Sequence, residues 1–139
     1  MTKTNQYSKS PNNLVVIALG DPAGIGIEVT LKALGSLDFH QNMRPLLVGC
    51  KRNVELIYLK LKNQGISSIA NPADIEIEDI PFNEKLSAGE PNLHTGQASF
   101  EWLTRASEMV LTKRAKALVT APIAKHAWQA SGHNYPGQT

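Results

Sequence analysis

The stretch Leu14–Leu34, LVVIALGDPAGIGIEVTLKAL, changes its pattern at a glycine-rich corner. The six residues before the corner are apolar and rich in β-branched side chains, which is typical of a strand buried inside a parallel sheet. After Gly26, apolar residues are interspersed with polar ones in a run of good helix formers, which favours a helix. The stretch therefore predicts a strand, a turn and a helix.

The corner Gly20–Gly26 has two interpretations. Glycines allow positive φ and let a ligand approach the main chain, and the first turn of a helix offers unpaired N–H groups. However, the glycine spacing matches neither the G-x-G-x-x-G pattern of dinucleotide-binding folds nor a P-loop. From the residues alone, a ligand-binding loop and a tight structural turn are equally good hypotheses. Asp21 in turn could cap the turn or contact a ligand hydroxyl.

Composition restricts the class of protein. A chain of 139 residues is long enough for one domain with a core. No apolar run approaches the ~20 residues that span a bilayer, and the net charge of +2 is scattered, so neither a membrane nor a nucleic acid is an expected partner. Residues 1–13 lack the apolar segment of a signal peptide and are interpreted as a disordered polar lead-in of a cytoplasmic protein. The single cysteine, Cys50, is expected to be a packed core thiol.

The rest of the chain continues the alternation of strands and helices. The segment 63–90 is broken by glycine and proline and is expected to run along one edge of the sheet, with a half-exposed or edge strand at 75–78. In the long helix, Phe100, Leu103, Ser107 and Val110 fall on one side. This order predicts an α/β domain whose mainly parallel sheet is flanked by helices. The other expected elements are strands at 46–48 and 117–120 and helices at 51–62, 98–113 and 124–131.

Ligands of such sheets bind at the carboxyl ends of the strands. The corner and the turn Thr120–Lys125 both follow strands, so they could face one pocket. Lys125 could hold an anion there, or it could be an ordinary solvated lysine. The segment Gly132–Thr139 is polar and irregular, and is either a frayed tail or part of a site that belongs to a longer protein.

Three segments together resemble the 4-hydroxythreonine-4-phosphate dehydrogenases of pyridoxal phosphate synthesis. Gly20–Gly26 followed by Glu28 resembles the GDPAGIGPE corner of that family. Thr120–Ile123 with Lys125 resembles its TAPINK turn, and Tyr135–Thr139 resembles its YPGHT segment. The resemblance covers the chain from about Leu14 to its end.

The resemblance implies an NAD- or NADP-dependent enzyme with a divalent metal (zinc, magnesium or cobalt). Such an enzyme oxidises 4-phosphooxy-L-threonine, and decarboxylation then gives 3-amino-2-oxopropyl phosphate. It also implies two α/β domains like those of isocitrate and isopropylmalate dehydrogenases, in a homodimer. Residues 14–139 would then be the N-terminal, incomplete part of a dehydrogenase domain that continues after residue 139, and this fragment alone would be inactive. The alternative is a stand-alone α/β module that binds a small anion or a protein without catalysis.

Site residues follow from the same resemblance. Gln138 and Thr139 match the substrate-binding His-Thr pair of the family. Gln138 can position a substrate but cannot titrate near neutral pH as the usual histidine does. No catalytic residue is identified, and the family's metal ligands lie downstream, so none is expected among His40, His94, His126 and His133. The residues expected to line the cleft are Gly20, Asp21, Gly24, Gly26 and Lys125.

Overall fold

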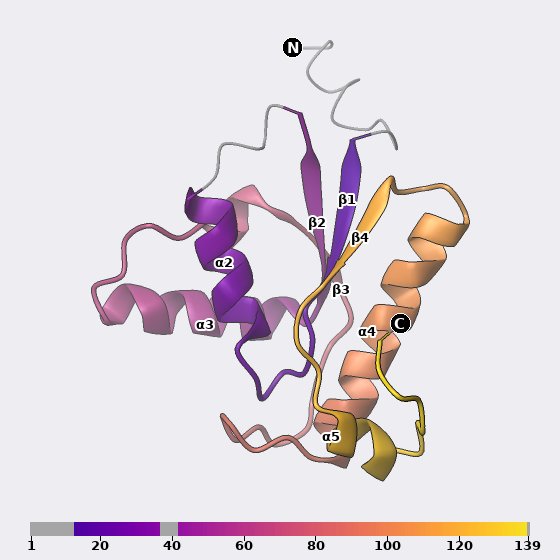
Figure 1. The fold of residues 1–139 in the computed structure, drawn as a ribbon. Coiled ribbons are helices and arrows are strands. Elements are labelled where there is room, and N and C mark those ends of the chain that lie inside the picture. The colour runs from indigo at the N-terminus through magenta and orange to yellow at the C-terminus, as the bar shows by residue number, and fades with distance from the viewer. Residues whose placement is uncertain (1–12, 37–41, 139) are drawn as a thin grey trace.

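A parallel four-stranded sheet forms the centre of the computed structural model, which describes residues 13–36 and 42–138 (Figure 1). The strand order is β3-β2-β1-β4, and all three pairings between neighbours are parallel. Along the chain the elements are β1 (Leu14–Ala18), α2 (Gly26–Ser36), β2 (Arg44–Gly49), α3 (Lys51–Asn63), the 3₁₀ turn η1 (Pro72–Asp74), β3 (Glu76–Asp79), α4 (Leu93–Leu111), β4 (Ala117–Thr120) and α5 (Lys125–Ala130). The predicted α/β class and parallel sheet are confirmed.

The strand β1 lies inside the sheet, between β2 and β4. All five of its residues are buried, because the strand is hydrogen-bonded on both sides and covered on both faces. This explains the continuous apolar run of the sequence. By contrast, β3 pairs only with β2 among the described strands and is partly exposed, as predicted for an edge strand in this segment.

Helices cover both faces of the sheet. In Figure 1, α2 and α3 lie on one side, whereas α4 and α5 lie on the other. Trp102 of α4 is fully buried in the core, and its indole N–H donates to the carbonyl of Ile80 at 3.3 Å. Cys50 is also buried and free, which confirms the prediction of a packed core thiol. Among the described helices, none combines the length and the apolar character that crossing a bilayer requires.

The helix α4 begins at Leu93, five residues before the predicted start at Ala98. Asn92 caps it: its side-chain oxygen accepts from the N–H groups of His94 (2.9 Å) and Thr95 (3.1 Å), and the Thr95 hydroxyl accepts from the Asn92 N–H at 2.8 Å. This reciprocal capping starts the helix earlier than its apolar periodicity indicates. His94, which precedes the predicted start of the helix, therefore lies in its first turn.

The most deeply buried side of α4 also differs from the apolar stripe of the sequence. Trp102, Ala106 and Met109 are buried, whereas Phe100 and Leu103 of the predicted stripe are only half-buried. The two stripes are neighbours with the same helical spacing, so periodicity alone does not choose between them. Packing on the sheet determines which stripe is buried, because small side chains such as Ala106 fit against the core. Phe100 then remains available for other contacts.

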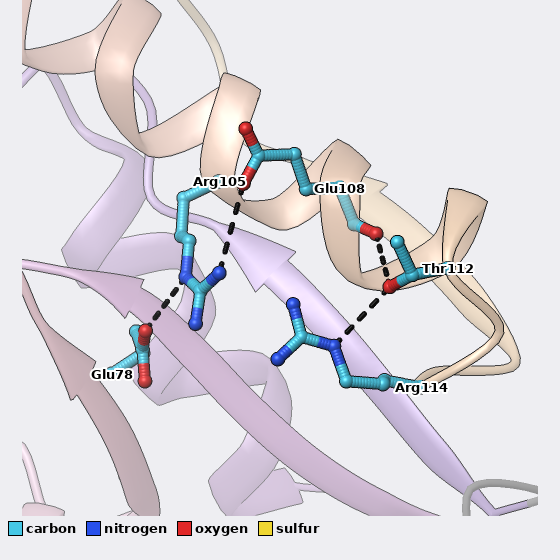
Figure 2. Close-up of polar contacts among 5 residues, drawn as sticks. All are labelled: Glu78, Arg105, Glu108, Thr112 and Arg114. Carbon is cyan, nitrogen blue, oxygen red and sulfur yellow. Dashed lines mark hydrogen bonds and ion pairs between the residues drawn. The ribbon is translucent and has the colours of Figure 1, made fainter.

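An arginine attaches the edge strand β3 to α4. The Arg105 Nε donates to Glu78 of β3 at 2.8 Å, and its guanidinium lies 3.6 Å from Glu108 on the next turn (Figure 2). The hydrogen bond and the charge of Glu78 raise the pKa of the Arg105 guanidinium. These side chains are about one-third exposed or more, so water screens both ion pairs. The ion pairs therefore contribute more to the orientation of β3 than to its stability.

A close contact between α4 and α5 gives a prediction. A Cβ added at Gly96 would lie 2.1 Å from the carbonyl oxygen of Ala127, which is backbone and not easily moved. Gly96→Ala should therefore destabilise the fold by about 1–2 kcal/mol, because overpacking outweighs the better helix propensity of alanine. The measurement is the midpoint of urea unfolding. Gly137→Ala is the control, since a Cβ there meets nothing within 4 Å; an unchanged or higher midpoint for Gly96→Ala would contradict the prediction.

Candidate functional site

The three sequence motifs meet at the carboxyl ends of β1 and β4. The corner Gly20–Gly26 follows β1, the turn after Thr120 follows β4, and both lie at the lower end of the sheet in Figure 1. The Asp21 N–H donates to the Pro122 carbonyl at 3.0 Å. The Gln138 side-chain amide donates to the Ala121 carbonyl over a long 3.4 Å. The fold thus brings together segments that are more than a hundred residues apart in sequence.

Glycine is required at two positions of the corner for different reasons. Gly20 has a φ of +77°, and a Cβ there would lie 2.2 Å from the Pro122 carbonyl oxygen. At Gly26 a Cβ would lie 2.2 Å from the Leu19 carbonyl oxygen. Gly24 is exposed, and its N–H donates to the Asp21 carbonyl at 2.9 Å. The first two glycines therefore serve close approach within the chain itself, and Gly24 is the one that faces outward.

Asp21 points into the protein. Its residue is only 3% exposed. One carboxylate oxygen accepts from the Ala23 N–H at 2.8 Å, and the other accepts from the Thr95 hydroxyl at 3.0 Å. The turn-capping geometry considered from the sequence is therefore present, and both carboxylate oxygens are engaged inside the chain.

Burial has a cost for this carboxylate. Removal from water raises the pKa of Asp21, whereas the hydrogen bonds from Ala23 and Thr95 and the nearby His126 ring act in the opposite direction without cancelling the effect. The Asp21 carboxylate is thus held in its charged form less easily than an exposed aspartate. Its two hydrogen bonds make this burial tolerable.

Thr95 connects the corner with the cap of α4. The same hydroxyl that donates to Asp21 also accepts from the Asn92 N–H, so the buried carboxylate and the helix cap form one connected network. Sequence reasoning missed both Thr95 and Asn92. The signal was present, because N-x-x-T at residues 92–95 is a variant of the capping-box pattern.

Aromatic rings hold the segment 133–138 against α4. The Phe100 ring stacks on His133 with 3.6 Å between centroids and 9° between planes, and on Tyr135 with 5.8 Å and 10°. Trp128 meets the same ring edge-on at 5.3 Å. His133 is further fixed by a 2.8 Å hydrogen bond between its Nε2 and the Gln97 side-chain oxygen.

A groove of about 370 Å³ lies beside this segment. Phe100, Leu103 and Ser107 of α4 form one wall, and Gly137 and Gln138 contribute to the other. The groove therefore runs along the side of α4 that the sequence had marked as its apolar face. It places an amide, hydroxyl groups and apolar surface beside α4, a combination that suits polar small molecules and peptide groups alike.

The other predicted residues lie apart or outside the described residues. Lys125 is exposed at the start of α5, His94 and His126 are exposed, and His94 lies 3.9 Å from Glu84. Residues 1–12, His40 and Thr139 fall outside the described part of the chain. Within residues 13–36 and 42–138, no three His, Cys, Asp or Glu side chains gather in a way that could hold a metal.

Comparisons with known proteins agree with the motifs. The family model described as pyridoxal phosphate biosynthetic protein PdxA matches residues 41–139. A 4-hydroxythreonine-4-phosphate dehydrogenase of Synechococcus sp. (strain RCC307) is 51% identical over 90% of this chain, and one of Thermosynechococcus vestitus is 38% identical over 90%. The chain spans 37% and 36% of the lengths of these relatives.

Solved structures give the same answer for the fold. The crystal structure of a 4-hydroxythreonine-4-phosphate dehydrogenase from Burkholderia phymatum superposes with a TM-score of 0.78 at 26% identity, over 90% of this chain and 41% of that one. The described sheet and helices therefore correspond to a part of a larger known architecture.

The buried carboxylate predicts a pH dependence of stability. The pKa of Asp21 is raised above its ordinary value of 3.8 in the folded chain. At pH values between 3.8 and this raised pKa, the folded chain therefore binds more protons than the unfolded chain. Wild-type stability should therefore fall as the pH rises from 3.8 through the raised pKa. Asp21→Asn, which does not titrate, should lack this component of the fall in urea unfolding at a series of pH values. The exposed Asp74→Asn should keep it, and identical pH profiles for the two variants would refute the assignment.

Loss of the Thr95 hydroxyl should be costly. Thr95→Val keeps the shape of the side chain but removes the donor to Asp21 and the acceptor for the Asn92 N–H, so it should destabilise the fold by about 1–3 kcal/mol near neutral pH. Thr95→Ser keeps the hydroxyl and should retain most of the stability. The midpoint of urea unfolding reports both variants. A valine variant as stable as the serine variant would show that the network contributes nothing.

Proposed function

Because this chain belongs to the PdxA family, we propose that the complete protein is an NAD- or NADP-dependent dehydrogenase that oxidises 4-phosphooxy-L-threonine. Loss of carbon dioxide from the oxidised product would give 3-amino-2-oxopropyl phosphate, a step of pyridoxal phosphate synthesis. The observation that carries the proposal is the convergence of the corner, the turn after β4 and the Tyr135–Gln138 segment at one end of the sheet.

The reaction requires groups besides those described. Oxidation of the secondary alcohol removes a hydride from carbon and a proton from oxygen, and the nicotinamide accepts the hydride. A divalent metal, for which zinc, magnesium and cobalt are candidates, would polarise the substrate oxygen when bound. The described residues provide no ligand set for that metal, so we assign them no step of metal chemistry. We further propose that the complete enzyme is a cytoplasmic homodimer.

Within this chain we assign substrate binding to Gln138 and Thr139. The Gln138 side chain is half-buried beside the groove, and its amide group can both donate and accept hydrogen bonds. It stands where the family usually has histidine, but it has no charged form near neutral pH. Gln138 therefore positions the substrate and transfers no proton. Asp21 and Gly20 support the site from inside by fixing the corner against Pro122.

The test is an assay of the complete protein. Purified protein is mixed with 4-phosphooxy-L-threonine, NAD or NADP, and each of the three metals in turn, and the reduced nicotinamide is followed by its absorbance. We expect turnover with at least one combination and formation of carbon dioxide and 3-amino-2-oxopropyl phosphate. Absence of turnover in every combination, from protein that is folded by circular dichroism, would refute the proposed activity.

The positioning role of Gln138 predicts a specific kinetic effect. Gln138→Ala should lower kcat/KM by the loss of one or two hydrogen bonds, of order 1–3 kcal/mol and so roughly five- to a hundredfold, without moving the pH–rate profile. Gln138→His should retain much of the activity. Gln129→Ala is a matched control at an exposed position of α5 and should be silent. A shifted limb of the pH profile, or an unchanged kcat/KM, in Gln138→Ala would contradict the role.

A further inference from the structure

We infer that Phe100 is a positioning residue whose ring holds the segment 133–138 in place, so that Gln138 reaches the substrate. This inference rests on the proposed function only for its kinetic consequence. Its structural basis is the stack in which the Phe100 ring lies nearly parallel to both His133 and Tyr135, at interplanar angles of 9° and 10°. Phe100 itself has no polar group. Along the chain, β4 and α5 separate α4, which holds Phe100, from Gln138.

The segment has few other attachments. After α5 the chain turns at Gly132, whose φ is +94°, and then runs without helix or strand. At its start the His133 N–H donates to the Trp128 carbonyl at 2.8 Å and the His133 ring is hydrogen-bonded to the Gln97 side chain at 2.8 Å; at its far end Gln138 makes the long contact to Ala121. Between these two ends, the stack on Phe100 places Tyr135, whose side chain remains 57% exposed.

The base of the stack belongs to a helix that packs on the core. Phe100 belongs to α4, whose opposite side carries the fully buried Trp102, and the edge-on Trp128 fixes the orientation of the Phe100 ring. The start of α4 is joined to the corner through Thr95 and Asp21. The positions of α4 and of the corner therefore determine, through Phe100, where the segment that carries Gln138 lies.

The flat ring is the property that this arrangement uses. A leucine would keep apolar volume at position 100 but could not present a planar face to two parallel rings, and aromatic pairs stabilise a structure beyond the area that they bury. A tyrosine would keep the face. Substitutions can therefore separate the stacking role of Phe100 from simple packing in the core.

The first experiment needs no activity. Amide hydrogen exchange is followed by mass spectrometry in the complete protein and in Phe100→Leu, Phe100→Tyr and Tyr135→Leu. We expect faster exchange over residues 133–138 in Phe100→Leu and Tyr135→Leu, wild-type exchange in Phe100→Tyr, and unchanged exchange in β1. Phe82→Leu, the same change at another half-buried phenylalanine that packs on the core, is the control and should leave 133–138 unchanged. Tyr135 is exposed, so its substitution tests the stack even if Phe100→Leu does not fold.

The second experiment tests the link to Gln138. In an active protein, Phe100→Leu should raise KM for the phosphorylated substrate about three- to tenfold with a smaller change in kcat, and Gln138→Ala should cost less in the Phe100→Leu background than alone. Fully additive effects, or unchanged exchange over 133–138 in the leucine variants, would overturn the inference. An inactive wild-type protein would refute the proposed function instead, and the exchange result would still decide the role of Phe100.

Discussion

A buried carboxylate between two hydrogen-bond donors is the contact on which the rest of this structure depends. Asp21 receives the Ala23 N–H inside the corner and the hydroxyl of Thr95 from a helix that begins more than seventy residues later. Because burial of an unpaired carboxylate is expensive, the two segments can pack only in the arrangement that supplies both donors. The position of the corner and the position of α4 are therefore set together.

This coupling explains how a site forms from segments without much regular structure. The corner contacts the turn after β4 through Asp21 and Pro122, at a distance that only glycine at position 20 permits. The helix α4, fixed at its start by Thr95, provides Phe100 as a flat support for residues 133–138. Each irregular segment is thus held by a regular element, which is how rigid scaffolds position binding loops.

Family membership gives these contacts a chemical meaning. The chain matches the family model over residues 41–139 and spans little more than a third of its curated relatives, so its contacts form one part of the proposed active site. Within that part, we propose a direct role toward substrate for Gln138 and a supporting one for the inward-facing groups Asp21 and Thr95. Because both oxygens of the Asp21 carboxylate are engaged inside the chain, we propose that this residue acts on a ligand through the shape of the corner and not through its charge.

The sequence by itself determined the elements and their class: the apolar run of β1, the helical periods and the glycine corner predicted a parallel α/β sheet, because strand burial and helix amphipathicity are local patterns. It also identified three motifs as candidates for the site. It did not locate the start of α4, because the apolar pattern that predicted the helix does not extend back to the Asn92 cap. It also did not show which of two adjacent stripes of that helix is buried. The inward direction of Asp21, its partner Thr95 and the stack on Phe100 join residues distant in sequence. Only the tertiary structure decided them, since a buried polar group or ring finds its partner through packing and not through spacing along the chain.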